Sequence, residues 1–234
     1  RMQRIAVLAS GRGSNLQAIL DAIAAGTLSA QVVGVFSDKP GAIALQRVDP
    51  SLRWSADPKT FDSREAFEAA LGDAVAASNA DWIVCAGSIR LLGDALVARF
   101  RGRMLNIHPS LLPRHRGLRT HARCLEAGET EHGASVHFVI PELDAGAVIA
   151  QARVPVYLDD DAERLAARVL EVEHPLLIAA LRLATAGRLA EHDANATLDG
   201  HALFTPLLLD SAGALCSPQS GRPIWAAPCR RPIT

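Results

Sequence analysis

The sequence has little lysine, no long apolar run and no surplus of positive charge. Lysine occurs only at positions 39 and 59, and the formal net charge of the 234 residues is −1. Binding nucleic acid through its phosphates needs a broad basic surface, so this charge argues against nucleic-acid binding. No apolar run reaches the roughly 18 residues of a membrane span, and the first residues carry no secretory pattern. We therefore expect a cytoplasmic protein that uses neither nucleic acid nor a membrane as partner.

Paired cysteines are also missing. The four cysteines, at positions 85, 124, 216 and 229, form no CxxC pair, and no group of histidines and cysteines has zinc-finger spacing. We expect reduced thiols and no metal, with one disulfide between Cys216 and Cys229 as the alternative. The acidic run 159–161 is interpreted as a solvated helix start rather than a metal site.

The apolar pattern predicts an α/β fold. Residues 4–9 and 32–36 are short apolar runs on either side of a helical pattern at 15–25, which is typical of a βαβ unit with parallel strands. Further strands are expected at 83–86, 104–107, 134–140 and 147–156, and helices at 63–75, 91–100, 119–127 and 159–186, the last kinked at Pro175. We expect one Rossmann-like domain over residues 1–205, with a parallel or mixed sheet and helices on both faces, followed by an irregular tail over 206–234.

A glycine-rich turn joins the first strand to the first helix. Residues 10–15 read Ser-Gly-Arg-Gly-Ser-Asn, and the unpaired N–H groups of a helix N-terminus bind anions well. The turn lacks the Gly-Lys-Ser/Thr of a nucleoside-triphosphate loop and the third glycine of a dinucleotide fingerprint. This favours a monophosphate over NAD as ligand; a tight turn without a ligand is the alternative.

Two polar residues alternate at the end of a later strand. Because successive side chains of a strand point to opposite faces, Asn106 and His108 should share one face while Leu105 and Ile107 occupy the other. The carboxyl end of a strand is where α/β sheets bind ligands. Asn106 and a protonated His108 could donate hydrogen bonds to the oxyanion that forms when an amine attacks a formyl carbonyl. A satisfied polar pair without catalytic role is the alternative.

Residues 106–113, Asn-Ile-His-Pro-Ser-Leu-Leu-Pro, resemble the signature of the folate-dependent formyltransferases. In that family an asparagine and a histidine act beside a distant aspartate, and the residue here that matches the aspartate is Asp144. Segments 11–19, 61–66, 86–92, 131–137 and 171–174 resemble the members that act on glycinamide ribonucleotide. The likeness runs in unbroken order from about residue 4 to about residue 200.

The resemblance implies the formyltransferase fold and transfer of the formyl group of 10-formyltetrahydrofolate to the amino group of glycinamide ribonucleotide, a step of purine (IMP) biosynthesis, by a monomer or homodimer without a metal. It implies catalytic roles for Asn106, His108 and Asp144, with Asp144 favouring the charged form of His108. The ribonucleotide would contact Gly13, Ser14, Asn15 and Glu173. The folate would contact Arg64, Ile89, Arg90, Leu91, Leu92, Ile140, Pro141, Glu142 and Leu143.

Several points stay open. Ser88, Arg119 and Pro175 depart from the family pattern, which leaves substrate affinity undetermined. His137 fits a structural role as well as a place in the site. Methionyl-tRNA formyltransferase activity would call for an RNA-binding domain and positive charge, and formyltetrahydrofolate hydrolase activity for a regulatory domain, for which we expect no room. A phosphate-binding sensor with an inactive site is the non-enzymatic alternative.

Overall fold

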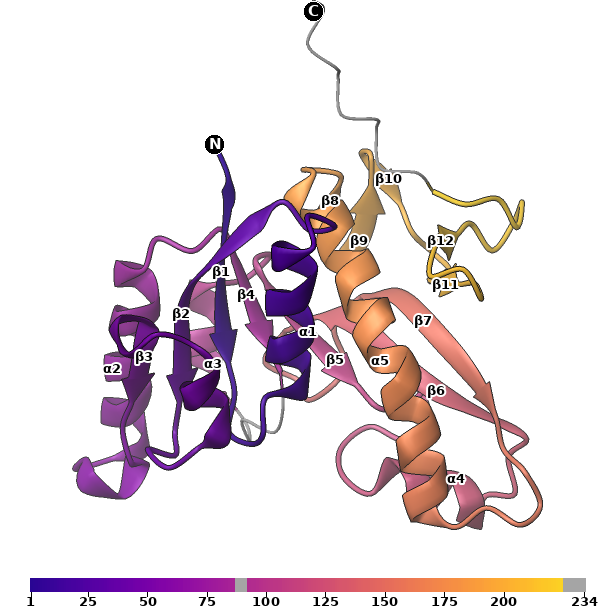
Figure 1. Cartoon of the computed structure of the whole chain (residues 1–234), viewed down its shortest axis with the longest axis horizontal. Helices are drawn as coiled ribbons and strands as arrows, with labels where there is room; N and C mark the ends of the chain where they lie inside the picture. The colour runs from indigo at the N-terminus through magenta and orange to yellow at the C-terminus, as the bar shows by residue number, and fades with distance from the viewer. Residues whose placement is uncertain (87–91, 225–234) are drawn as a thin grey trace, which may run out of the picture.

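A computed structural model describes residues 1–86 and 92–224, which form a mixed sheet covered by helices on both faces (Figure 1). The strand order is β12-β11-β7-β6-β5-β4-β1-β2-β3. The strands of this sheet are β1 (Gln3–Leu8), β2 (Ala30–Ser37), β3 (Arg53–Ser55), β4 (Trp82–Cys85), β5 (Met104–His108), β6 (Glu131–Phe138), β7 (Val148–Pro155), β11 (Leu207–Leu209) and β12 (Leu215–Cys216). The order confirms the parallel β1–β2 unit expected from the sequence.

The sheet changes direction at β6. Strands β3, β2, β1, β4 and β5 run parallel, whereas β6 pairs antiparallel with both β5 and β7. The parallel half places the carboxyl ends of β4 and β5 at one edge, which is where ligands bind in such sheets. A smaller sheet, in the order β10-β9-β8, consists of β8 (Leu189–His192), β9 (Asn195–Leu198) and β10 (His201–Ala202).

Helices pack on the two faces because the buried strands are apolar on both sides. Along β1, Ile5 and Val7 belong to one hydrophobic cluster while Ala6 and Leu8 belong to the other. The first cluster lies under α1 (Ser14–Ala24) and α5 (Ala162–Thr185), and the second under α2 (Arg64–Ala77) and α3 (Asp94–Arg99). The remaining helical elements are α4 (Thr120–Glu126), η1 (Ile43–Arg47), η2 (Pro50–Leu52) and η3 (Pro58–Thr60).

The long helix α5 begins where the acidic run predicted. The side chain of Asp161 accepts a hydrogen bond from the backbone N–H of Arg164 at 2.8 Å, and so caps the helix. Asp160 accepts two hydrogen bonds, at 2.6 and 2.8 Å, from the guanidinium of Arg168. The helix runs on through Pro175, whose exposed ring lies on the solvent side.

The C-terminal part differs from the irregular tail expected over 206–234. Strand β11 pairs parallel with β7, and β12 pairs antiparallel with β11, so residues 207–216 extend the sheet. Leu207 and Leu215 are buried there, because the edge of the sheet offers their side chains an apolar surface. Cys216 is a free thiol, and Cys229 lies outside the described residues. Among the described helices, none combines the length and the hydropathy that a bilayer crossing requires.

Candidate active site

A cavity of about 590 Å³ opens at the carboxyl ends of β4 and β5. Its lining brings together predicted residues from five separate parts of the chain, namely Asn15, Leu92, Asn106, His108, Ile140, Pro141, Leu143, Asp144 and Glu173. Leu105 and Ile107 belong to the core cluster under α1 and α5, which confirms that β5 turns its apolar and polar side chains to opposite faces.

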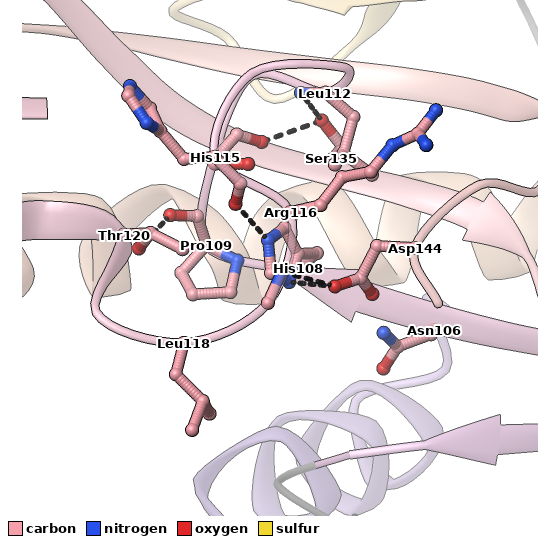
Figure 2. Close-up of polar contacts among 12 residues, drawn as sticks. Asn106, His108, Pro109, Leu112, His115, Arg116, Leu118, Thr120, Ser135 and Asp144 are labelled. Atoms are coloured by element: carbon pink, nitrogen blue, oxygen red, sulfur yellow. Dashed lines mark hydrogen bonds and ion pairs between the residues drawn. The ribbon is translucent and has the colours of Figure 1, made fainter. Parts of the chain in front are cut away.

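Asp144 lies beside His108 within this cavity (Figure 2). Oδ2 of Asp144 is 3.5 Å from Nδ1 of His108, and both side chains are more than nine-tenths buried. The backbone N–H of Gly117 donates a hydrogen bond to the same Oδ2 at 2.9 Å. Asp144 has a φ of 50°, in the left-handed region that aspartate tolerates better than most residues. The predicted trio is therefore assembled.

The second nitrogen of His108 is held by the loop that follows β5. Nε2–H of His108 donates to the backbone carbonyl oxygen of His115 at 2.8 Å, and Figure 2 shows that carbonyl turned toward the His108 ring. Because a neutral imidazole carries one proton, this bond leaves Nδ1 as the acceptor that faces Asp144. His108 can therefore take up a second proton at Nδ1, next to a carboxylate.

His137 is the residue that sequence reasoning left open, and the structure brings it into the site. Its Nδ1–H donates to the carbonyl oxygen of Phe138 at 2.9 Å, so its Nε2 can accept a hydrogen bond from Nδ2 of Asn106 at 3.2 Å. The same Nε2 lies 3.6 Å from Oδ1 of Asp144. The amide nitrogen of Asn106 carries two hydrogens, and the one that His137 does not accept is available to the cavity.

Burial decides the charge of His108. Desolvation lowers the pKa of His108 below its ordinary 6.5, although the bond to the His115 carbonyl and the charge of Asp144 act to raise it. Asp144 favours the charged form, as the resemblance implies, but burial outweighs this contribution. Burial also opposes ionisation of Asp144, but the hydrogen bond from the Gly117 N–H helps to bring the pKa of Asp144 below its ordinary 3.8.

The glycine turn lies at the start of α1, next to the cavity. Gly13 adopts a φ of 78° and caps α1 without a side chain, which leaves the first N–H groups of the helix open to a ligand. The η1 segment braces the turn: the N–H of Ala44 donates to the Gly11 carbonyl at 3.0 Å, and Nε of Arg47 donates to the Arg12 carbonyl at 2.7 Å. Ser14 follows Gly13 as the first residue of the helix, and Asn15 reaches the cavity wall.

Glu173 projects from α5 into the same cavity. Desolvation raises the pKa of Glu173 to about 7, so a substantial fraction of this carboxyl is protonated at neutral pH. Oδ1 of Asn15, which lines the cavity with it, is buried without a hydrogen-bond partner among the described residues. Oδ1 of Asn15 and the carboxyl of Glu173 can therefore each accept a hydrogen bond from an N–H or O–H group of a bound ligand.

Some predicted folate contacts lie elsewhere. Arg64 lines a second hollow, of about 530 Å³, together with Lys39 and Lys59, and its guanidinium stacks 5.0 Å from the ring centroid of Phe67. Glu142 is exposed and lies 3.6 Å from Arg116, between two residues that do line the main cavity. Ile89, Arg90, Leu91 and the departing residue Ser88 lie outside the described residues.

Sequence reasoning missed the part played by loop 109–119 and by the first residues of α4. Gly117, Leu118, Thr120 and His121 line the cavity, and the carbonyl of His115 orients His108. The prolines and glycine of this loop predicted an irregular segment, but backbone groups that accept or donate a bond carry no residue-type signal. Gly117 is an example: it contributes its backbone N–H, which almost every residue type possesses, so its identity alone could not predict this role.

Known proteins resemble this chain in both sequence and fold. Residues 3–181 match the family described as formyl transferase. The chain is 44% identical over 201 residues to the phosphoribosylglycinamide formyltransferase of Escherichia coli K12, covering 85% of this chain and 95% of the relative. The solved phosphoribosylglycinamide formyltransferase of Coxiella burnetii is similar with a TM-score of 0.82 and 43% identity, covering 87% of this chain and 96% of that one.

A more distant structure carries a different activity in its name. The formyltetrahydrofolate deformylase of Pseudomonas syringae is similar with a TM-score of 0.75 and 27% identity, covering 85% of this chain and 66% of that one. The family match spans well over half of the chain, and the chain covers 95% of the Escherichia coli relative. The chain therefore belongs to the formyl transferase family and is a formyl-transferring enzyme.

Proposed function

We propose that this enzyme transfers the formyl group of 10-formyltetrahydrofolate to the amino group of glycinamide ribonucleotide. The observation that carries the proposal is the meeting of Asn106, His108 and Asp144 in one cavity that the start of α1 borders. The relatives in Escherichia coli and Coxiella burnetii that bear the name phosphoribosylglycinamide formyltransferase support the same substrate.

The phosphate of the ribonucleotide would bind at the glycine turn. The backbone around Gly13 presents N–H groups at the positive end of the α1 dipole, which attracts a phosphate. From there to the cavity the chain offers Asn15, whose unpartnered Oδ1 would accept a hydrogen bond from a hydroxyl or amide of the substrate. This places the sugar between the turn and the catalytic trio.

Glu173 would bind the glycinamide end of the substrate. Its carboxyl lines the cavity with Asn106 and His108, and once ionised it would accept a hydrogen bond from the neutral amino group of the substrate. Bringing the amine beside the formyl carbonyl in a fixed orientation removes much of the entropic part of the barrier.

In the chemical step the amine attacks the formyl carbon and the carbonyl oxygen becomes an oxyanion. The free N–H of Asn106 would donate to that oxygen. The proton that the amine loses would pass to Nδ1 of His108, directly or through a water held by Asp144, and the resulting imidazolium would donate to the oxyanion as well. Collapse of the adduct breaks the bond to N10 of the folate, which receives the proton from His108.

The folate would lie on the apolar side of the cavity. Leu92, Val97, Val139, Ile140 and Leu143 supply that surface, and such walls suit a flat heterocycle. Arg64 lies at the second hollow with Lys39 and Lys59. These three cations outnumber the two carboxylates there, Asp38 and Asp57, so the hollow could receive the glutamate carboxylates of the folate.

A steady-state assay tests the proposal. Purified protein, given 10-formyltetrahydrofolate and glycinamide ribonucleotide, should form formylglycinamide ribonucleotide and tetrahydrofolate in equal amounts. Parallel reactions contain initiator methionyl-tRNA or no acceptor, because the deformylase similarity makes hydrolysis the nearest competing activity. If formate is released with or without the ribonucleotide and no formylated product forms, the enzyme is a hydrolase rather than a transferase.

A further inference from the structure

Three potential metal ligands meet outside the catalytic cavity. His115 lies in the loop after β5, Cys124 in α4 and Glu129 in the turn that follows α4. Their ligand atoms, a ring nitrogen, a sulfur and a carboxylate oxygen, all lie within 4.8 Å of one another. Both carboxylate oxygens of Glu129 are 3.0 Å from Nε2 of His115. The spacing of these residues along the chain matches no zinc motif, so only the fold reveals the group.

The group is closed on one side and open on the other. Cys124 is fully buried in the core cluster under α5, while the side chains of His115 and Glu129 are 13% and 22% exposed. A cation could therefore enter past the imidazole and the carboxylate and meet the sulfur at the bottom. Arg114 lies 3.9 Å from Glu129, but its side chain is 58% exposed and can turn away into solvent.

The geometry does not suit nucleophilic catalysis. In a nucleophilic triad the base uses one ring nitrogen for the thiol and the other for the carboxylate. Here Nε2 of His115 pairs with Glu129 at 3.0 Å, whereas Sγ of Cys124 donates to the backbone carbonyl oxygen of Glu131 at 3.7 Å. Burial and the carboxylate of Glu129 raise the pKa of the Cys124 thiol to about 12, so no reactive thiolate forms at neutral pH.

We propose that His115, Cys124 and Glu129 form a binding site for a zinc-like divalent cation, with water as the fourth ligand. A thiolate and a carboxylate would balance the two positive charges, and imidazole completes a ligand set that zinc prefers over magnesium or calcium. Zinc bonds of about 2.0–2.3 Å set the ligands roughly 3–4 Å apart, so the group needs to contract by about 1 Å around the ion.

The site is joined to the catalytic cavity through one residue. The ring of His115 belongs to the cluster, while its backbone carbonyl accepts the hydrogen bond from Nε2 of His108 at 2.8 Å. Figure 2 shows the His115 ring pointing away from His108, on the far side of the loop. A bound cation would restrain the residue that orients His108, and would hold loop 109–119 in place.

Cobalt binding tests the site, because a thiolate ligand to Co²⁺ gives a charge-transfer band in the near ultraviolet. The chelator-treated full chain should bind one equivalent of Co²⁺ with this band, release the thiol proton, and lose the band when Zn²⁺ displaces the cobalt. Cys216→Ser changes another buried thiol and should behave like the parent. Cys124→Ser should lose the band and bind at least roughly tenfold more weakly.

A second variant guards against misfolding of Cys124→Ser. Glu129→Gln alters a partly exposed side chain, and should keep the charge-transfer band while it weakens Zn²⁺ binding at least roughly tenfold in competition with a chromophoric chelator. Zn²⁺ should also raise the melting temperature of the parent and of Cys216→Ser more than that of Glu129→Gln. The proposal is overturned if the parent shows no thiolate band with excess Co²⁺, or if Glu129→Gln binds Zn²⁺ as tightly as the parent does.

Discussion

Oδ2 of Asp144 lies 3.5 Å from Nδ1 of His108, the one nitrogen of that ring which the His115 carbonyl leaves open. The arrangement gives His108 a fixed orientation and a single position for a second proton. Because burial outweighs the attraction of Asp144, the ring is neutral before the reaction and gains its charge as the amine attacks. The carboxylate then stabilises the imidazolium at the moment when the oxyanion needs a donor.

This order of events predicts an acid limb in the pH profile of kcat/KM. Protonation of His108 removes the proton acceptor, and the pKa of His108 lies below 6.5, so the limb that His108 causes should lie below that value. Glu173, with a pKa of about 7, is proposed to bind the ribonucleotide as a carboxylate and would add a limb of its own. The profile is therefore measured on Glu173→Gln as well as on the parent, with glycinamide ribonucleotide far below KM. A limb with its midpoint above pH 6.5 in Glu173→Gln would contradict a neutral resting His108.

Asp144→Asn should shift that limb and slow the reaction. Asparagine can still accept the hydrogen bond from the Gly117 N–H, but it removes the charge that raises the pKa of His108. The limb should therefore move to still lower pH, and kcat should fall roughly 10²–10⁴-fold. Circular dichroism and the melting temperature serve as folding controls. If Asp144 had a purely structural role, Asp144→Asn would lower both stability and activity but would leave the acid limb of the pH profile unshifted.

Asn106→Ala should lower kcat with little change in either KM. The amide is proposed to donate to an oxygen that becomes charged only in the transition state, and loss of such a donor costs roughly 10²–10³-fold in kcat. Asn195→Ala, an exposed asparagine of β9, is the matched control and should retain full activity. If Asn106→Ala raised KM and kept kcat, the amide would act in binding rather than in catalysis.

Local sequence patterns predicted some parts of the site, whereas other parts depend on contacts that form only in the folded chain. Alternation in β5 predicted that Asn106 and His108 share a face, and the glycine turn predicted the start of α1. Asp144 came from resemblance alone, because nothing in its own segment indicates that it lies beside His108. The role of the His115 carbonyl and the pairing of β11 with β7 depend on contacts between distant residues.

Glu173→Gln should make the protein more stable at alkaline pH. The pKa of Glu173 rises from 4.5 in the unfolded chain to about 7 in the folded one, so between these values the native state binds more protons than the unfolded state. The free energy of unfolding therefore falls as pH rises through this window and levels off above about 7. Glutamine has no charge to desolvate, so at pH 8 the variant should gain roughly 1–3 kcal/mol, a figure reduced for the partial exposure of the side chain.

Urea unfolding at pH 4.5 and pH 8 measures the effect, with Glu171→Gln, an exposed neighbour on α5, as control. At pH 4.5 the free energy of unfolding of both variants should equal that of the parent. At pH 8 only Glu173→Gln should have a higher free energy of unfolding than the parent. Because the carboxylate is proposed to bind the substrate, Glu173→Gln should also raise KM for the ribonucleotide. Equal stability of Glu173→Gln and the parent at pH 8 would show that burial does not penalise this charge.

Gly13→Ala should weaken binding of the phosphate in particular. A Cβ at this position would lie 2.7 Å from the Cβ of Ala44, and the φ of 78° is one that alanine rarely adopts, so the turn must shift. KM for glycinamide ribonucleotide should rise several-fold or more. Gly41→Ala is the control, because its added Cβ meets nothing within 4 Å. With the dephosphorylated riboside as acceptor, Gly13→Ala and the parent should become equally poor, since the lost contact is one that only the phosphate makes. A similar penalty with both acceptors would instead show that the substitution disturbs more of the site than the phosphate contact.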